Sequence, residues 1–85
     1  MIEMTDEDKA MIIDFGALGY PFDKIANILS WDKVEVRKLM QDQNSELMKL
    51  YLKGKDTAQY KLDMKLFELA TSGDLKAMEM WKKRK

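Results

Sequence analysis

Apolar residues between positions 22 and 39 have the spacing of two short helices that cross over a tight turn. One face of the first helix carries Ile25, Ala26 and Leu29. The residues that can face inward from the second helix are Val34, Val36 and Leu39. Ala26 is the most constraining position, because steeply crossing helices leave room there for only a small side chain. Ser30 occupies the turn position where glycine is most common, and Trp31 after it is expected to fill the core. This spacing predicts a helix-turn-helix.

The second of these helices begins with a residue pair at the spacing of a capping box. The Asp32 side chain can accept a hydrogen bond from the backbone amide of Glu35, while the Glu35 side chain reaches back. A helix packed by its inner face leaves its polar residues outward, where they can enter a DNA major groove. The predicted DNA-binding residues are Lys33, Arg37, Lys38 and Gln41. The same helix pair also occurs in proteins that use it only for packing.

The charge of the chain is balanced overall but divided between its two parts. The formal net charge of the 85 residues is zero. Residues 1–32 carry seven acidic and two basic side chains, which gives a net charge of −5. Residues 33–85 carry eight acidic and thirteen basic side chains, which gives a net charge of +5. A neutral chain is not expected to bind nucleic acid strongly without sequence preference. The asymmetry allows an oriented contact through the basic part, or packing between subunits.

The residue types present argue against catalysis and against a membrane partner. The chain has no His and no Cys, and it contains no glycine-rich phosphate loop and no carboxylate pair suited to acid–base chemistry. The acidic cluster at residues 6–8 is accounted for by a helix start, so we expect no metal and no cofactor. No apolar run approaches the ~20 residues of a membrane span. The absence of cysteine fits the cytosol.

Helical spacing predicts an all-α fold along the rest of the chain. A first helix is expected from Thr5, which can cap with Asp8, to Gly19, and it should pack across the helix-turn-helix pair. Gly16 inside it suggests that another helix approaches closely. We therefore predict a three-helix helix-turn-helix module at residues 1–41, followed by an α-helical hairpin that serves for oligomerisation at residues 42–85.

The polar stretch at residues 41–45 is expected to link the two regions, with a continuous helix through it as the alternative. A short helix that is interrupted or kinked at Gly54 should follow, then the longest helix at about residues 56–72, and a last helix capped by Asp74. The longest helix carries more apolar residues than one small neighbour can cover, and a chain of this size buries only about 60% of its unfolded surface. We therefore expect an oligomer whose interface includes Tyr60, Leu62, Met64, Leu66, Phe67, Met78 and Trp81.

With both parts in place, residues 17–84 resemble the phage terminase small subunits. The resemblance starts with the helix-turn-helix and continues with a Tyr-x-x-Gly element, matched by Tyr51–Gly54, before a long helix. An Ala-x-x-Gly-Asp turn, matched by Ala70–Asp74, then leads into a helix with Ala77, Trp81, Lys82 and Arg84. The order and spacing of these pieces carry the resemblance.

The resemblance implies a non-catalytic DNA-packaging protein in the cytoplasm of a bacterial host. Such subunits recognise packaging-site DNA, assemble into rings and bring DNA to the large terminase subunit. The resemblance assigns contact with double-stranded DNA to the four predicted DNA-binding residues, Lys33, Arg37, Lys38 and Gln41. It assigns contacts within the core or between subunits to Leu62, Leu66, Phe67, Met78 and Trp81. The chain ends before the segment that usually engages the large subunit, as expected for a truncated sequence or a small satellite relative.

Two other functions fit the same sequence. The chain can be an adaptor that binds another terminase subunit and redirects or regulates packaging, or a transcriptional regulator of phage type. The segment 41–45 discriminates between DNA binding and the adaptor, because a mobile linker would let the module orient on DNA, whereas a rigid one suits a fixed assembly.

Overall fold

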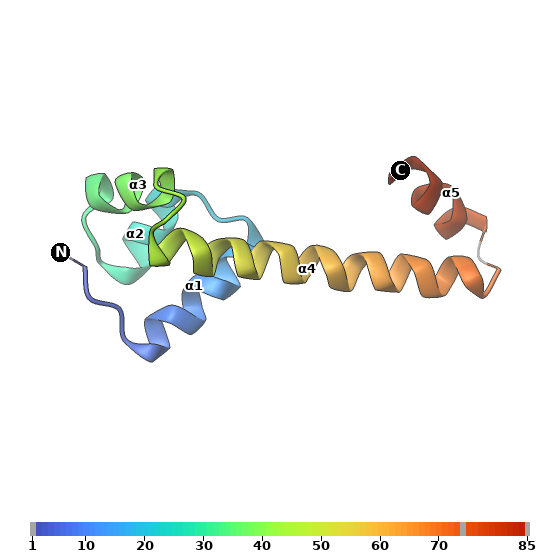
Figure 1. Cartoon of the computed structure of the whole chain (residues 1–85), viewed down its shortest axis with the longest axis horizontal. Coiled ribbons are helices and arrows are strands. Elements are labelled where there is room, and N and C mark those ends of the chain that lie inside the picture. Colours follow the sequence, from blue (N-terminus) through green and yellow to red (C-terminus); the bar gives the residue numbers. More distant parts are fainter. Residues whose placement is uncertain (1, 74, 85) are drawn as a thin grey trace.

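The computed structural model describes residues 2–73 and 75–84, without the side chains of residues 77, 81 and 84. These residues form an all-α structure, which confirms the predicted fold class (Figure 1). The helices are α1 (Asp6–Leu18), α2 (Phe22–Leu29), α3 (Lys33–Gln41), α4 (Glu46–Thr71) and α5 (Leu75–Arg84). Over the described part of the chain, no helix combines the length and apolarity needed to cross a membrane.

The predicted ends of the first helices are confirmed. The Thr5 hydroxyl accepts from the Asp8 amide at 3.1 Å, and the Asp8 carboxylate accepts from the Thr5 amide at 3.1 Å, which completes a capping box. Gly19 ends α1 in the left-handed conformation, with φ 71°. Asp32 caps α3 by accepting a hydrogen bond from the Glu35 amide at 3.0 Å. Local hydrogen bonding thus fixes where these helices start and stop.

The hydrophobic core lies where the first three helices meet the beginning of α4. Its buried side chains come from all four helices: Ile12, Phe15, Ile25, Ala26, Val36 and Leu47. Trp31 is half-buried and packs against this cluster, in agreement with its predicted core position. Because Leu47 is completely buried, the start of α4 shares one core with the helix-turn-helix.

The main packing partner of α1 is α4, not the α2–α3 pair across which α1 was expected to pack. Two glycines make this close contact. A Cβ atom on Gly16 would lie 1.9 Å from the Tyr51 carbonyl oxygen, and one on Gly54 would lie 1.7 Å from the Ile13 carbonyl oxygen. The expected close approach at Gly16 is therefore confirmed, and the two backbones touch where both helices lack side chains.

The predicted break at Gly54 is wrong, because α4 runs without interruption through 26 residues. Gly54 is buried against α1. A helical glycine costs roughly 0.5–1 kcal/mol relative to alanine, and here the contact with α1 offsets that cost. The same residue therefore marks a helix crossing, whereas its sequence context suggested a helix end.

Two polar contacts show that α1 and α4 run in the same direction. Near their first turns, the Lys9 ammonium lies 3.0 Å from the Glu46 carboxylate, and a hydrogen bond to Glu46 raises the pKa of Lys9. Beyond the end of α1, the Tyr51 hydroxyl donates to the Tyr20 carbonyl oxygen at 2.9 Å. The Tyr51–Gly54 element thus holds α4 on the first helix and on the loop that follows it.

The connection between α3 and α4 is a short hydrogen-bonded turn. The Asp42 carboxylate accepts from the Asn44 amide at 2.9 Å. Ser45 is buried, caps α4 by accepting from the Met48 amide, and donates to the Leu39 carbonyl oxygen. The predicted linker is confirmed for residues 42–45, whereas Gln41 is the last residue of α3, and side-chain hydrogen bonds fix this segment.

The second half of α4 extends away from the core. The chain measures 51 × 22 × 21 Å with a radius of gyration of 16.4 Å, against about 12 Å for a compact chain of this length. Figure 1 shows α5 folding back beside the far end of α4. Among the described residues of α5 and of α4 beyond Gly54, Leu66 is the one buried hydrophobic residue, so this α4–α5 hairpin has a very small core.

We predict that Gly54→Ala lowers the free energy of unfolding by about 2 kcal/mol or more. Overpacking of a close contact should outweigh the gain of up to ~1 kcal/mol in helix propensity. The measurement is urea denaturation followed by circular dichroism at fixed protein concentration. Lys53→Ala, at an exposed neighbouring position of α4, should change stability by less than about 0.5 kcal/mol. A Gly54→Ala variant as stable as the parent would contradict the close contact.

Candidate nucleic-acid interface

Helices α2 and α3 are joined by the tight turn expected of a helix-turn-helix. Ser30 adopts the left-handed conformation with φ 58°, which costs a non-glycine residue about 1–2 kcal/mol. The Trp31 amide donates to the Ala26 carbonyl oxygen at 2.9 Å. Ala26 is 1% exposed, whereas Asn27 beside it is exposed. The structure therefore has the predicted register of α2.

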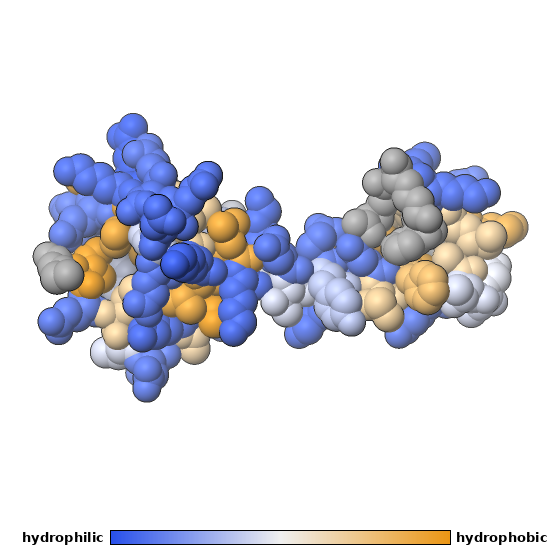
Figure 2. All heavy atoms as spheres, viewed as in Figure 1, coloured by the Kyte–Doolittle hydropathy of each residue, from blue (hydrophilic) through white to orange (hydrophobic). Residues whose placement is uncertain are grey.

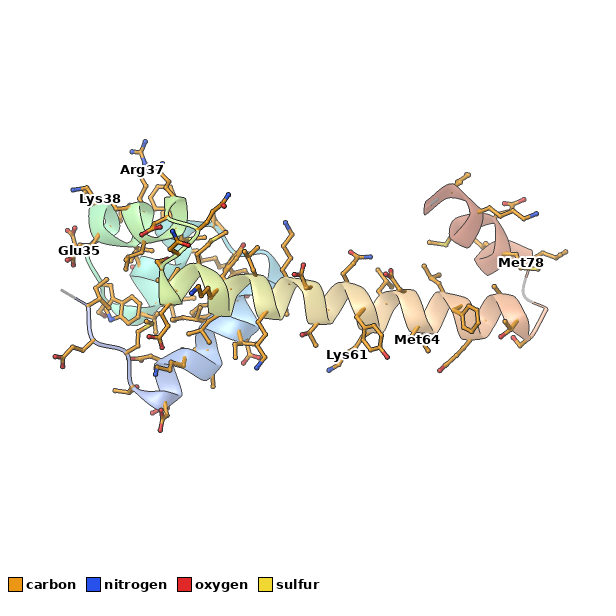
Figure 3. All side chains as sticks on the ribbon, in the orientation of Figure 1. Glu35, Arg37, Lys38, Lys61, Met64 and Met78 are labelled. Atoms are coloured by element: carbon orange, nitrogen blue, oxygen red, sulfur yellow. The ribbon has the colours of Figure 1, made fainter. Side chains whose placement is uncertain are left out.

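The predicted DNA-binding residues all lie on the exposed side of α3. Lys33, Arg37, Lys38 and Gln41 are exposed. Figure 3 shows the Arg37 and Lys38 side chains extending away from the body of the protein. The Arg37 guanidinium carbon lies 6.0 Å from the centroid of the Phe22 ring on α2, a distance at the limit of a cation–π contact. Helix α3 thus carries three cationic side chains and one amide side chain on its exposed side.

The prediction that Val34 faces inward is wrong, since 58% of this residue is exposed. Val36 is completely buried, and two residues along an α-helix are turned by about 200° from each other. Val34 and Val36 therefore cannot share an inner face. Leu39 and Met40, which are half-buried, complete that face with Val36. The period of 3.6 residues could have identified Val34 as an outward residue.

The electrostatic surroundings of α3 are mixed. The helix itself carries three basic residues and Glu35, which gives a net charge of +2. A concavity of about 560 Å³ between α2 and the start of α3 is lined by residues of both signs, including Asp23, Lys24 and Lys33. The Lys24 ammonium is held 4.0 Å from the centroid of the Tyr20 ring. Helix α3 can therefore bind a polyanion, although its own net charge is modest.

The predicted oligomer-interface residues are mostly exposed on the α4–α5 hairpin. Tyr60, Leu62, Met64, Phe67 and Met78 are between 36% and 63% exposed. Leu66 is 8% exposed and so belongs to the interior of the chain, while the Trp81 side chain lies outside the described residues. Figure 2 shows apolar residues at the surface over this part of the molecule. Leu69 is also exposed, at 39%, although it was not among the predicted interface residues. It lies nine residues beyond Tyr60 and therefore on the opposite side of α4, together with Leu62.

Comparison of the chain with protein-family models, curated proteins and solved structures finds no match. Function must therefore be inferred from the arrangement of the residues.

We predict that Ala26→Leu lowers the free energy of unfolding by about 1–3 kcal/mol, the usual cost of overpacking. Ala26 is 1% exposed, so the three added heavy atoms would have to displace neighbouring groups. Asn27→Leu is the matched control, because the neighbouring side chain is exposed and should tolerate the change. Thermal melts of both variants provide the measurement. A harmless Ala26→Leu together with a destabilising Asn27→Leu would contradict the register of α2.

Proposed function

We propose that the chain is a non-catalytic DNA-packaging protein of the terminase small-subunit type. It binds double-stranded packaging-site DNA through α3 and assembles into an oligomer through α4 and α5. The observation that supports this most is the placement of Lys33, Arg37, Lys38 and Gln41 on the outward face of the second helix of a helix-turn-helix. The resemblance of residues 17–84 to that family supplies the biological setting.

The outward face of α3 has the chemistry that a major groove requires. A recognition helix contacts base edges with residues near its start, while cationic side chains contact the phosphates. Lys33 and Arg37 are one helical turn apart and are followed at the same spacing by Gln41. Arginine and lysine pair with guanine edges, and glutamine pairs with adenine. These three residues can therefore contribute both affinity and sequence preference.

The affinity of a single chain for DNA should be modest and sensitive to salt. Few cations lie on α3, and Glu35 and the capping Asp32 reduce the local positive charge. Assembly compensates for this, because several weak sites held together bind DNA with much higher avidity. Binding by one chain and assembly are thus linked parts of the same proposal.

Assembly is supported by the exposed apolar surface of the α4–α5 hairpin. Tyr60, Met64 and Phe67 follow one another at spacings of four and three residues along one face of α4, and each is at least 38% exposed. Clusters of exposed apolar side chains often mark contact sites. A second copy of the chain presents the same surface, so a symmetric contact would bury both.

The adaptor function is the second candidate, and the connection between α3 and α4 favours it. Ser45 is buried and hydrogen-bonded to Leu39, so the helix-turn-helix has one fixed orientation on α4. A fixed module suits a permanent assembly with another terminase subunit. In that case α3 would contact protein, and removal of its cations would leave DNA binding unchanged.

We predict that the double substitution Arg37→Ala and Lys38→Ala weakens DNA binding and lowers the salt dependence. Each lost phosphate contact should reduce the slope of log affinity against log salt by about 0.9. If either residue pairs with a guanine, the loss of binding free energy should instead be about 1–3 kcal/mol and specific to one base position. Fluorescence anisotropy with labelled duplexes measures both effects.

The matched control is the double substitution Lys61→Ala and Lys65→Ala, which removes the same charge from exposed positions of α4. This variant should retain most of the parental affinity. Equal affinities for the parent and the α3 variant would refute the groove assignment and favour the adaptor.

We further predict that the protein is oligomeric at micromolar concentration and that Tyr60→Glu dissociates it. Tyr60 is 63% exposed, so a charge there should disturb the contact between chains more than the fold. Lys49→Glu, on the exposed surface of the first half of α4, should leave the assembly intact. Light scattering gives the mass, and a single 10 kDa species for the parent chain would count against assembly.

A further inference from the structure

Val34 occupies the centre of the outward face of α3. Arg37 and Lys38 stand three and four residues further along the helix, and Gln41 stands seven, so all three share the face of Val34. Lys33 precedes it at the first helical position. Among the nine residues of α3, all of which are described, Val34 alone is a large hydrophobic side chain with more than half of its surface exposed.

Neither packing nor helix propensity accounts for this valine. The inner face of α3 is formed without it by Val36, Leu39 and Met40. A β-branched residue is also a poorer helix former than the lysine, arginine or glutamine around it. An apolar group surrounded by cations and an amide fits a ligand that presents an apolar group among polar and negatively charged ones.

We propose that Val34 contacts the C5 methyl group of a thymine in the major groove. This inference rests on the proposed DNA-binding function and deepens it by assigning a base. The thymine methyl is the apolar feature of the major-groove pattern, and it lies between phosphate backbones that attract Arg37 and Lys38. Val34 is the second residue of α3, within the first turn from which recognition helices reach base edges.

Replacement of thymine by uracil tests this contact directly, because uracil pairs identically and lacks only the methyl group. Preferred duplexes are first selected from a randomised library with the full chain, and each thymine of the best duplex is then changed to uracil in turn. One such change should weaken binding by the parent chain about fourfold, the effect of losing one buried methylene-sized group. Val34→Ser should bind the thymine and uracil duplexes equally.

The control variant is Leu18→Ser, because Leu18 is 63% exposed at the end of α1, outside the helix-turn-helix. It should keep the fourfold preference for thymine. A parent chain that binds DNA through Arg37 and Lys38, yet tolerates uracil at every position, would overturn the inference and leave the proposed function standing. A Val34→Ser variant with an undiminished thymine preference would also overturn it. Complete absence of DNA binding would overturn both.

Discussion

The backbone contact between α1 and α4 at Gly16 and Gly54 determines the geometry of the whole molecule. Any side chain at either position would meet a carbonyl oxygen of the other helix well inside contact distance. The contact allows Leu47 to enter the core beside α2 and α3, and it aligns α4 so that its second half leaves the core. Since α4 spans roughly 39 Å at 1.5 Å per residue, the exposed apolar surface near Phe67 lies far from α3. Binding to a groove and binding to another chain can therefore occur at opposite ends of one protein.

Much of the helix-turn-helix could be predicted from the sequence because its signals are local. The caps formed by Thr5 and Asp32 require only residues three positions apart. Ala26 was identified by size alone, since a steep crossing excludes larger side chains, and it is buried as expected. The outward positions of Lys33, Arg37, Lys38 and Gln41 follow from helical periodicity, and all four are exposed. What these residues bind depends on a partner, which neither periodicity nor the isolated fold contains.

The features that sequence reasoning missed depend on contacts between distant segments. Gly54 has the local character of a helix breaker, and only its position opposite Ile13 explains why α4 continues through it. Ser45 belongs to a polar stretch typical of a loose linker, but its hydroxyl hydrogen-bonds to Leu39 and fixes the turn. Val34 is a different case, because the 3.6-residue period already separates it from Val36. Its hydrophobic character favoured an inward assignment that the helix geometry does not allow.

Lysine footprinting distinguishes DNA binding through α3 from DNA binding through the far part of α4. The full chain would be acetylated with and without duplex DNA, and the reactivity of each lysine measured by mass spectrometry. If α3 binds DNA, Lys33 and Lys38 should be protected by DNA, with little change at Lys61 and Lys65; all four lysines are exposed in the structure. Unchanged reactivity of Lys33 and Lys38 under conditions where DNA is bound, with protection confined to α4 and α5, would contradict DNA binding through α3.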